Sequence, residues 1–117
     1  LLADEPTSVG GSNLGPSPYE FLTSGLGACT AMTIKMYADR KKWPLEEVLV
    51  HLNYDNKYLE DCDKCETEER KIGKFQRIIE VKGNLDEGQR KRILQIANKC
   101  PVHKTLEQGV TIETQMK

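Results

Sequence analysis

The sequence of 117 residues predicts a single α+β domain, residues 1–117, with a long central helix and a mainly antiparallel sheet. Three observations indicate this class: a long stretch with helical periodicity, two alternating apolar stretches after it, and a second helical pattern. In chain order, the sequence predicts a loop over 1–18, a helix over 19–42, strands over 48–54 and 73–83, helices over 84–100 and 101–109, and a strand over 110–116.

The helix over 19–42 carries apolar residues at steps of three and four. They are Leu22, Leu26, Cys29, Met32 and Met36. This spacing places them on one helix face, so we expect Met32 and Met36 in the core. Pro44 follows the helix and ends it.

The first half of this predicted helix contains two glycines and so lacks side chains at those positions. Gly25 and Gly27 together cost about 2 kcal/mol in an exposed helix, so they indicate close packing by another backbone. The helix is also too apolar for so small a domain to bury alone. We therefore expect a second copy of the chain to pack against it as a homodimer.

The later elements have clear sequence signals. In 48–54 apolar and polar residues alternate, which is typical of a half-buried strand. Asp86 and Gln89 form the pattern of a helix cap. The inner face of the helix that follows is expected to comprise Ile93, Leu94, Ala97 and Cys100. Pro101 begins the next helix and Gly109 closes it.

Composition and charge exclude several classes of partner. The net charge is −1, so no basic field favours nucleic acid or an anionic membrane surface. The apolar runs are too short to span a bilayer, and no signal peptide is visible. We expect a soluble cytoplasmic protein whose four cysteines are thiols rather than permanent disulfides.

Two of the cysteines lie on predicted helices. Cys100 stands at the start of the helix over 101–109, where backbone N–H groups lower a thiol pKa; equally, it could fill the last turn of the preceding helix. Cys29 lies on a predicted buried face, and its position alone favours an inert core thiol. Residues 1–28 contain no lysine or arginine, so a cation for Cys29 must come from elsewhere, namely Arg70, Arg77, His103 or another chain.

The other two cysteines, Cys62 and Cys65, form a C-x-x-C pair in a charged stretch. A zinc site, a redox dithiol and no function at all are three readings that the pair alone does not separate. A zinc site would need further ligands, such as His51 or the neighbouring carboxylates of Asp61, Asp63 and Glu66.

Two motifs resemble a known family. The stretch "GPSPYEFLTSGLGACTAMTIKMYADRKKWPLE", followed by "CPVHKTL", resembles the OsmC/Ohr family, named for osmotically inducible protein C and organic hydroperoxide resistance protein. The resemblance extends over nearly the whole chain, from 4–11 to the end. It implies an intertwined α+β homodimer in which two long central helices are wrapped by sheets. The active sites would lie at the dimer interface.

The resemblance also implies a chemistry. Cys29 matches the peroxidatic cysteine of characterised relatives, and Cys100 matches the resolving cysteine. The Cys29 thiolate would attack an organic hydroperoxide and become a sulfenic acid, which Cys100 would convert to a disulfide. A dithiol reductant would restore the thiols, with no metal or organic cofactor. The reactive role that the resemblance implies for Cys29 thus conflicts with the inert core thiol that its position alone favours.

The sequence departs from the family pattern at two points. Relatives place an arginine from an N-terminal strand beside the peroxidatic thiol, whereas the given sequence has no arginine before Cys29, and we expect the hairpin that would carry it to be absent or cut off. Hydroperoxide reductases also carry a glutamate directly after the proline at the helix start, where this chain has Tyr19, followed by Glu20.

Other residues are candidates to orient the thiols. Glu20, together with Arg70 or Arg77, is expected to orient the site. His103 either pairs with a thiolate or is a half-exposed helix residue. The sequence thus supports a thiol peroxidase acting on organic hydroperoxides in the oxidative stress response. The alternative is an OsmC-like dimer that binds a ligand or zinc without turnover.

Overall fold

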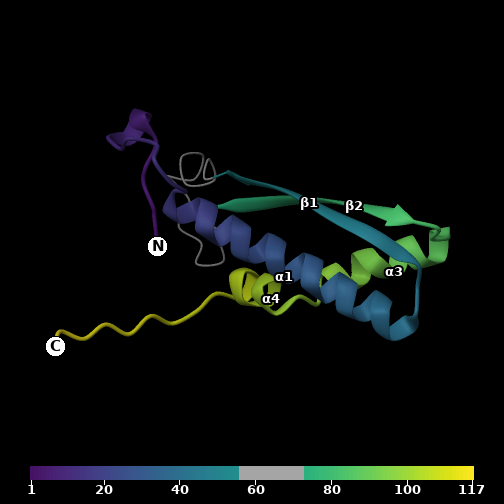
Figure 1. Cartoon of the computed structure of the whole chain (residues 1–117). Helices are drawn as coiled ribbons and strands as arrows, with labels where there is room; N and C mark the ends of the chain where they lie inside the picture. Colours follow the sequence, from purple (N-terminus) through teal and green to yellow (C-terminus); the bar gives the residue numbers. More distant parts are fainter. Residues whose placement is uncertain (56–72) are drawn as a thin grey trace, which may run out of the picture. The chain divides into compact units, whose positions relative to one another are not determined.

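A computed structural model describes residues 1–55 and 73–117 (Figure 1). Its elements, in order, are the short 3₁₀ helix η1 (Thr7–Val9), α1 (Pro18–Lys41), β1 (Leu45–Asp55), β2 (Lys74–Gly83), α3 (Glu87–Ala97) and α4 (Pro101–Gln108). The strands β1 and β2 pair in a two-stranded antiparallel sheet. The α+β class is confirmed, and the three helices and two strands lie close to the ranges that periodicity predicts.

The strand expected over 110–116 is wrong. After α4 the chain runs without regular structure to its end, and Val110 and Ile112 are exposed (Figure 1). An alternating pattern forms a strand only where a neighbouring edge takes its backbone hydrogen bonds. In the described sheet, β1 pairs with β2 and residues 110–116 do not take part.

The chain divides into two compact units. The first contains residues 1–27 and 50–80, and the second contains residues 28–49 and 81–117. The elements α1, β1 and β2 each run from one unit into the other, and each unit is described by itself.

The first unit begins with a loop that folds around one carboxylate. Asp4 accepts hydrogen bonds from the backbone N–H groups of Glu5, Ser12 and Leu14 at 2.8, 3.1 and 3.0 Å. The bond from Leu14, followed by those from Glu5 and Ser12, lowers the pKa of Asp4 despite partial desolvation. The glycine-rich N-terminal stretch is therefore an organised loop.

The first unit also holds the start of α1. The Ser17 hydroxyl accepts the Glu20 N–H at 3.3 Å, and the Glu20 carboxylate accepts the Ser17 N–H at 3.4 Å. These reciprocal bonds form a capping box. Nearby, Tyr19 stacks on Tyr54, with ring centroids 4.4 Å apart, and Phe75 packs against Tyr54 at 4.8 Å.

A close approach explains one of the two helix glycines. A Cβ atom added to Gly27 would lie 2.6 Å from the Leu52 side chain, so the bare position admits β1 against α1. A Cβ atom at Gly25 would meet nothing within 4 Å in the described structure. Within the described part of the chain neither glycine therefore meets the expected second backbone, and Gly27 makes room for a side chain.

The core of the second unit lies between α1 and α3. On α1 the buried row is Thr30, Ile34 and Ala38, and on α3 it is Ile93, Ile96 and Ala97. Met32 and Met36 are not core residues, because their side chains are 63% and 69% exposed. A helix turns about 100° per residue, so a row at 30, 34 and 38 leaves 32 and 36 on the opposite side.

A similar correction applies to α3. Leu94 is 57% exposed, whereas Ile96 is buried beside the correctly expected Ile93, Ala97 and Cys100. The cap of this helix is confirmed: the Asp86 carboxylate accepts the Gln89 N–H at 2.7 Å, and the Gln89 side chain accepts the Asp86 N–H at 2.9 Å.

Aromatic and cationic side chains join the ends of α1 and α3. The Trp43 ring packs edge-on against the Tyr37 ring, with centroids 5.3 Å apart. The backbone N–H of Trp43 donates to the Ala38 carbonyl at 2.9 Å. Arg92 of α3 donates to the Tyr37 hydroxyl at 3.1 Å. Trp43 thus anchors the turn after α1.

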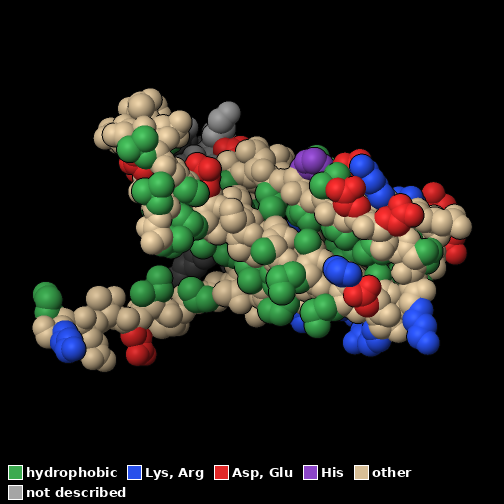
Figure 2. Space-filling model, viewed as in Figure 1, with side chains coloured by type: hydrophobic (Ala, Val, Ile, Leu, Met, Phe, Trp, Pro, Cys, Tyr) green, Lys and Arg blue, Asp and Glu red, His purple; other side chains and the backbone are tan. Residues whose placement is uncertain are grey.

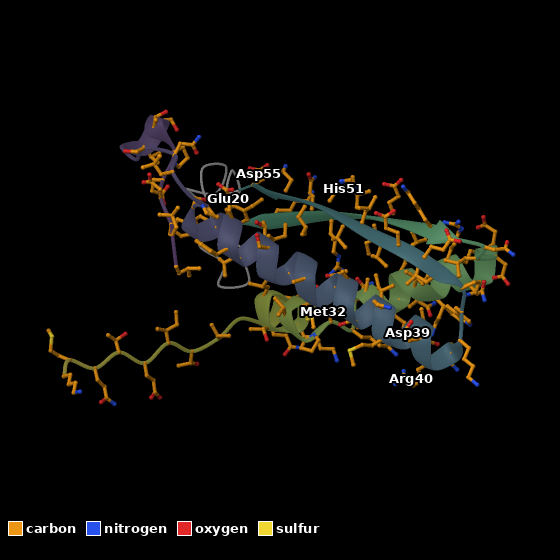
Figure 3. All side chains as sticks on the ribbon, in the orientation of Figure 1. Glu20, Met32, Asp39, Arg40, His51 and Asp55 are labelled. Carbon is orange, nitrogen blue, oxygen red and sulfur yellow. The ribbon has the colours of Figure 1, made fainter. Side chains whose placement is uncertain are left out.

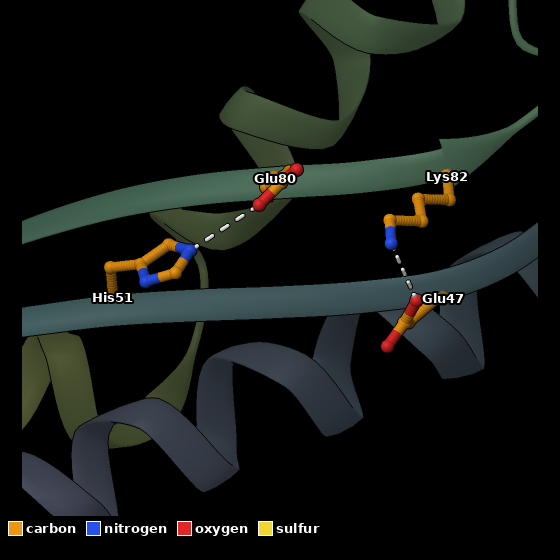
Figure 4. A network of polar contacts seen from close by, with 4 residues as sticks. All are labelled: Glu47, His51, Glu80 and Lys82. Carbon is orange, nitrogen blue, oxygen red and sulfur yellow. Dashed lines mark hydrogen bonds and ion pairs between the residues drawn. The ribbon is translucent and has the colours of Figure 1, made fainter.

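Two polar pairs bridge β1 and β2 on the exposed face of the sheet (Figure 4). In the first unit His51 Nε2 lies 3.4 Å from Glu80 Oε2, and in the second unit Lys82 Nζ lies 3.3 Å from Glu47 Oε2. All four side chains are about half exposed or more, so the pairs contribute little to stability. None of the helices described here is both long enough and apolar enough to cross a membrane.

Candidate functional site

Cys29 lies in the second unit, on the part of α1 that belongs to it. The side chain is half-buried and the thiol is reduced. Thr33 follows four residues later, so its side chain lies one helical turn further along the same face. The helix therefore presents a thiol and a hydroxyl side by side.

Cys100 occupies the joint between α3 and α4. Helix α3 ends at Ala97 with Asn98 as its C-cap, and α4 begins at Pro101. Cys100 is the N-cap of α4, where its Sγ accepts the N–H of His103 at 3.5 Å. The side chain is fully buried, and its thiol is also reduced.

The two thiols are brought together. The side chain of each cysteine shifts the pKa of the other, so the two thiols are neighbours within the second unit. Cys29 also accepts hydrogen bonds from the Val102 N–H, in the first turn of α4, and from the Thr33 side chain. The start of one helix thus supplies donors to a sulfur carried by another.

These contacts set the two thiols at different acidities. Burial raises the pKa of Cys29, but the hydrogen bonds from Cys100, Val102 and Thr33 together lower it below its ordinary value. Burial raises the pKa of Cys100, the Cys29 side chain raises it further, and the backbone N–H groups of His103 and Val102 lower it only in part. Cys29 is therefore the thiol that ionises more readily.

This outcome differs from the expectation for Cys29 from its position alone. Cys29 was expected to be an inert core thiol with a raised pKa, and the donors gathered around it overturn that expectation. For Cys100 the sequence left two readings open, a thiol at the start of α4 and a filler of the preceding turn, and the structure shows features of both: its Sγ accepts the His103 N–H of α4, and its side chain is fully buried. Backbone N–H groups at the start of α4 lower the pKa of both thiols, but burial outweighs them at Cys100.

Other candidate residues have defined neighbours of their own. The His103 imidazole lies 3.2 Å from the Glu107 carboxylate, one turn later on α4, and is 22% exposed. Glu20 lies in the first unit, in the capping box at the start of α1, and Figure 3 shows it near that end of the helix. Arg77 lies in the same unit on the half-buried face of β2.

Three predicted residues, Cys62, Cys65 and Arg70, lie outside the described residues. Of the further zinc ligands considered, Asp61, Asp63 and Glu66 lie outside them as well, and His51 contacts Glu80. Within the described ranges, no group of three or more histidine, cysteine or acidic side chains is arranged to hold a metal ion.

Sequence reasoning missed two donors, Thr33 and Val102. The first could have been found from its spacing, because a hydroxyl four residues after a helical cysteine lies on the same face. The second is a backbone group of α4, and only the packing of α4 against α1 within the second unit brings it to Cys29.

Comparison with protein families gives a match over residues 10–115 to the model described as OsmC-like protein. The chain belongs to the OsmC-like protein family. The resemblance of the two cysteine motifs is thereby confirmed. No curated protein sequence matches this OsmC-like chain.

Solved structures with the same fold come from several bacteria. A Psychrobacter arcticus protein described as osmotic stress induced and as a detoxification response protein matches with a TM-score of 0.71 and 20% identity, covering 88% of this OsmC-like chain and 69% of that one. An OsmC-like protein from Mycoplasma pneumoniae matches with a TM-score of 0.66 and 24% identity, covering 91% and 70%.

A third structure, an organic hydroperoxide resistance protein OsmC from Legionella pneumophila, matches with a TM-score of 0.63 and 20% identity, covering 88% and 70% of the two chains. At these identities the comparisons establish the OsmC fold of this chain.

Proposed function

We propose that the protein is a thiol-dependent peroxidase that reduces organic hydroperoxides. The observation that carries the proposal is the pair of neighbouring reduced thiols in which the pKa of Cys29 is lowered and that of Cys100 is raised. A thiol peroxidase needs one ready nucleophile and one nearby thiol that waits for the second step. The organic hydroperoxide resistance protein from Legionella pneumophila, which has this fold, adds support.

The first step transfers one oxygen atom. The Cys29 thiolate attacks the terminal oxygen of R–O–OH, so that an S–O bond forms as the O–O bond breaks. The leaving alkoxide takes up a proton and departs as the alcohol, and Cys29 becomes a sulfenic acid. The sulfur loses two electrons and the peroxide gains them.

The second step closes a disulfide and the third reopens it. The Cys100 thiolate attacks the sulfenic sulfur, an S–S bond forms, and hydroxide leaves as water after protonation. A dithiol reductant then exchanges with the disulfide through a mixed disulfide and is itself oxidised. This cycle uses protein thiols, a peroxide and a dithiol throughout.

The surface beside Cys29 favours an apolar peroxide. Met32 and Met36 follow Cys29 at three and seven residues, so they lie on the same face of α1, and both are exposed. Figure 3 shows Met32 on α1, and Figure 2 shows that hydrophobic side chains reach the molecular surface. The proposed substrate class is therefore organic hydroperoxides with an apolar body.

The proposal includes a homodimer in the cytoplasm. The exposed methionines of α1 support a second copy on that face, since soluble proteins seldom leave such stripes uncovered. Four cysteines in 117 residues are too few for a disulfide-stapled protein, which fits a reducing compartment. Glu20 and His103 are proposed as residues that orient the site in the assembled protein.

The test is peroxide consumption by the purified protein, with cumene hydroperoxide as substrate and a dithiol as reductant. We expect Cys29→Ser to fall to the rate of the buffer. Cys100→Ser is expected to react once and then to lose multiple turnover, because its sulfenic acid has no internal partner. A Cys62→Ser/Cys65→Ser double variant is the matched thiol control, and it should keep the wild-type rate.

A wild-type rate in Cys29→Ser would contradict the proposal. The alternative, a dimer that binds zinc or another ligand without turnover, predicts no consumption by any of the proteins. Metal analysis of freshly purified protein separates its zinc version, since a structural zinc site retains close to one equivalent of metal through purification.

A further inference from the structure

Three cationic side chains gather around the Tyr37 ring near the end of α1, within the second unit. The guanidinium carbon of Arg40 lies 5.4 Å from the ring centroid, and the Lys41 ammonium lies 5.8 Å from it. The guanidinium carbon of Arg92 lies 5.5 Å from the same centroid. Figure 3 shows Arg40 on the last part of α1, whereas Arg92 belongs to α3. Two helices thus direct positive charge toward one ring.

The three cations are left without a carboxylate partner in the part of the chain that the structure describes. The carboxylate of Asp39, which precedes Arg40, pairs instead with Lys35 at 3.2 Å. Arg92 donates to two neutral groups, the Tyr37 hydroxyl at 3.1 Å and the Gln95 side chain at 2.9 Å. Because like charges repel, this cluster leaves a local excess of positive charge that an anion would neutralise.

The Tyr37 hydroxyl supplies a hydrogen-bond donor at the same place. Its oxygen accepts the Arg92 Nε–H, and a phenol that accepts a hydrogen bond can still donate its own hydrogen. The hydrogen bond from Arg92 lowers the pKa of Tyr37 most, and the positive charges of the cluster lower it further despite desolvation. The positive potential therefore extends to the hydroxyl, where a ligand oxygen would meet a donor and three cations.

The backbone after α1 adds a fourth cation at an unfavourable position. Lys42 has a φ of 58°, in the left-handed region that favours glycine. The Lys42 N–H donates to the Asp39 carbonyl at 3.1 Å, and the Trp43 N–H donates to the Ala38 carbonyl at 2.9 Å. These two bonds form the helix ending in which glycine is usual at the position of Lys42. A lysine there adds positive charge to this end of α1 at a cost in backbone strain.

We propose that α1 and α3 together form a binding site for the phosphate group of a small anionic ligand. The side chains that form it are Tyr37, Arg40, Lys41 and Arg92. Phosphate suits the cluster, because guanidinium groups donate paired hydrogen bonds to its oxygens and its charge is strongly negative. The net charge of −1 gives no wide basic field of the kind that nucleic acids and anionic membranes bind. Tyr37 and Cys29 are about 12 Å apart along the axis of α1, so the site is separate from the thiol pair.

The single tryptophan of the chain, Trp43, provides the readout, because its ring lies 5.3 Å from the Tyr37 ring. The purified protein is titrated with inorganic phosphate at constant pH and ionic strength, and Trp43 fluorescence is recorded. We expect a saturable change that chloride at the same ionic strength does not produce. Isothermal titration calorimetry on the same samples measures the heat of binding.

A parallel titration with methyl phosphate, a simple monoester, separates two sources of the phosphate group. Tighter binding of the monoester would assign the site to a phosphorylated organic ligand. Tighter binding of inorganic phosphate would assign it to the free ion. Both results support the proposed phosphate site.

Lys41→Gln is the main variant, because it removes one charge at an exposed side chain and leaves the Arg92–Tyr37 hydrogen bond in place. We expect it to weaken phosphate binding roughly tenfold, as the loss of one charge-assisted contact predicts. Tyr37→Phe keeps the ring, removes the O–H donor and should also weaken binding. Lys91→Gln is the matched control, since it removes the same charge from an exposed position on α3 and should bind like the wild type.

Circular dichroism checks that each variant is folded. A wild-type protein that gives neither a fluorescence change nor a heat of binding with phosphate would overturn the proposal. So would equal weakening by Lys41→Gln and Lys91→Gln, because binding would then depend on overall charge and not on the cluster around Tyr37. The titrations contain no peroxide, so their result is independent of whether the protein reduces peroxides.

Discussion

Cys29 and Cys100 show how local contacts give two identical side chains different acidities. Both are removed from water, which disfavours the thiolate in each. Cys29 is surrounded by donors, whereas Cys100 gives its proton toward Cys29 and has the His103 N–H in return. Cys29 is thereby the more acidic of the two thiols, as the proposed mechanism requires of its nucleophile.

The lowered pKa of Cys29 fixes the direction of a pH dependence. We expect the midpoint of Cys29 alkylation to lie below the ordinary thiol value, because hydrogen bonds to the thiolate outweigh its desolvation. Peptide-resolved alkylation between pH 5 and 10 measures it. A midpoint at or above that of a short cysteine peptide would contradict the account.

The same shift is linked to stability. A group whose pKa is depressed on folding contributes stability above its unfolded pKa and loses it as pH falls through the folded value. The contribution of Cys29 is therefore present at alkaline pH and declines toward acid. Cys100 has the opposite sign, since its raised pKa favours the folded state below the unfolded pKa and opposes it as pH rises further.

At this scale, sequence reasoning singled out the two neighbouring thiols but not their acidities. The family motifs pointed to Cys29 and Cys100, whereas position on a helix gave the wrong pKa direction for Cys29 and left that of Cys100 open. The acidity depends on which groups face the sulfur after packing. The Val102 N–H is invisible to a motif, because every residue but proline has one.

At the scale of the secondary-structure elements, α1 and α3 each begin with a capping box. Each begins with a reciprocal pair, Ser17 with Glu20 and Asp86 with Gln89. The Glu20 carboxylate thus has a structural role, because it accepts the Ser17 N–H at the start of α1. Helix α3 in turn leads through Cys100 into α4, so its cap helps to hold the thiol joint.

Removal of the α3 cap should be measurable. We expect Asp86→Ala to lower the free energy of unfolding by about 1 kcal/mol, because the Gln89 backbone N–H loses the carboxylate that accepts it. Urea denaturation followed by circular dichroism gives the value. Lys91→Ala, an exposed change within the same helix, should stay within about 0.5 kcal/mol of wild type. Equal effects of the two substitutions would contradict the role of the cap.

Elements with local signals were predictable, and those that depend on a neighbour were not. Periodicity and caps gave the three helices and two strands, since each signal lies within the element itself. Residues 110–116 alternate like a strand but form none in the described sheet. The apolar stripe of α1 likewise did not show which side is buried, because Thr30 and Ala38 line the inner face while the methionines lie outside.

At the scale of the whole molecule, the most conspicuous feature is that α1 leaves several large apolar side chains exposed to water. Leu22, Met32 and Met36 are 45%, 63% and 69% exposed. Burial of such side chains is worth about 1.5–3 kcal/mol each, which gives a second copy of the chain a reason to cover them. The homodimer proposed above would cover these side chains on the helix that carries Cys29.

A charge placed on this stripe should separate the copies. We expect the wild-type protein to sediment at twice the mass of one chain, and Met32→Glu/Met36→Glu to sediment as a monomer, because a dimer would bury both carboxylates. Analytical ultracentrifugation measures the mass, and circular dichroism checks the fold. Ser24→Glu, at an exposed position on another face of α1, is the control and should remain dimeric. A dimeric double variant, or a monomeric wild type, would contradict the proposal.

The most direct test of the central claim is mass spectrometry of the reduced protein after one molar equivalent of an organic hydroperoxide, with peptide mapping of all four cysteines. The account predicts a rapid disulfide between Cys29 and Cys100, while Cys62 and Cys65 remain thiols. Four untouched thiols, or a disulfide that leaves Cys29 free, would contradict it.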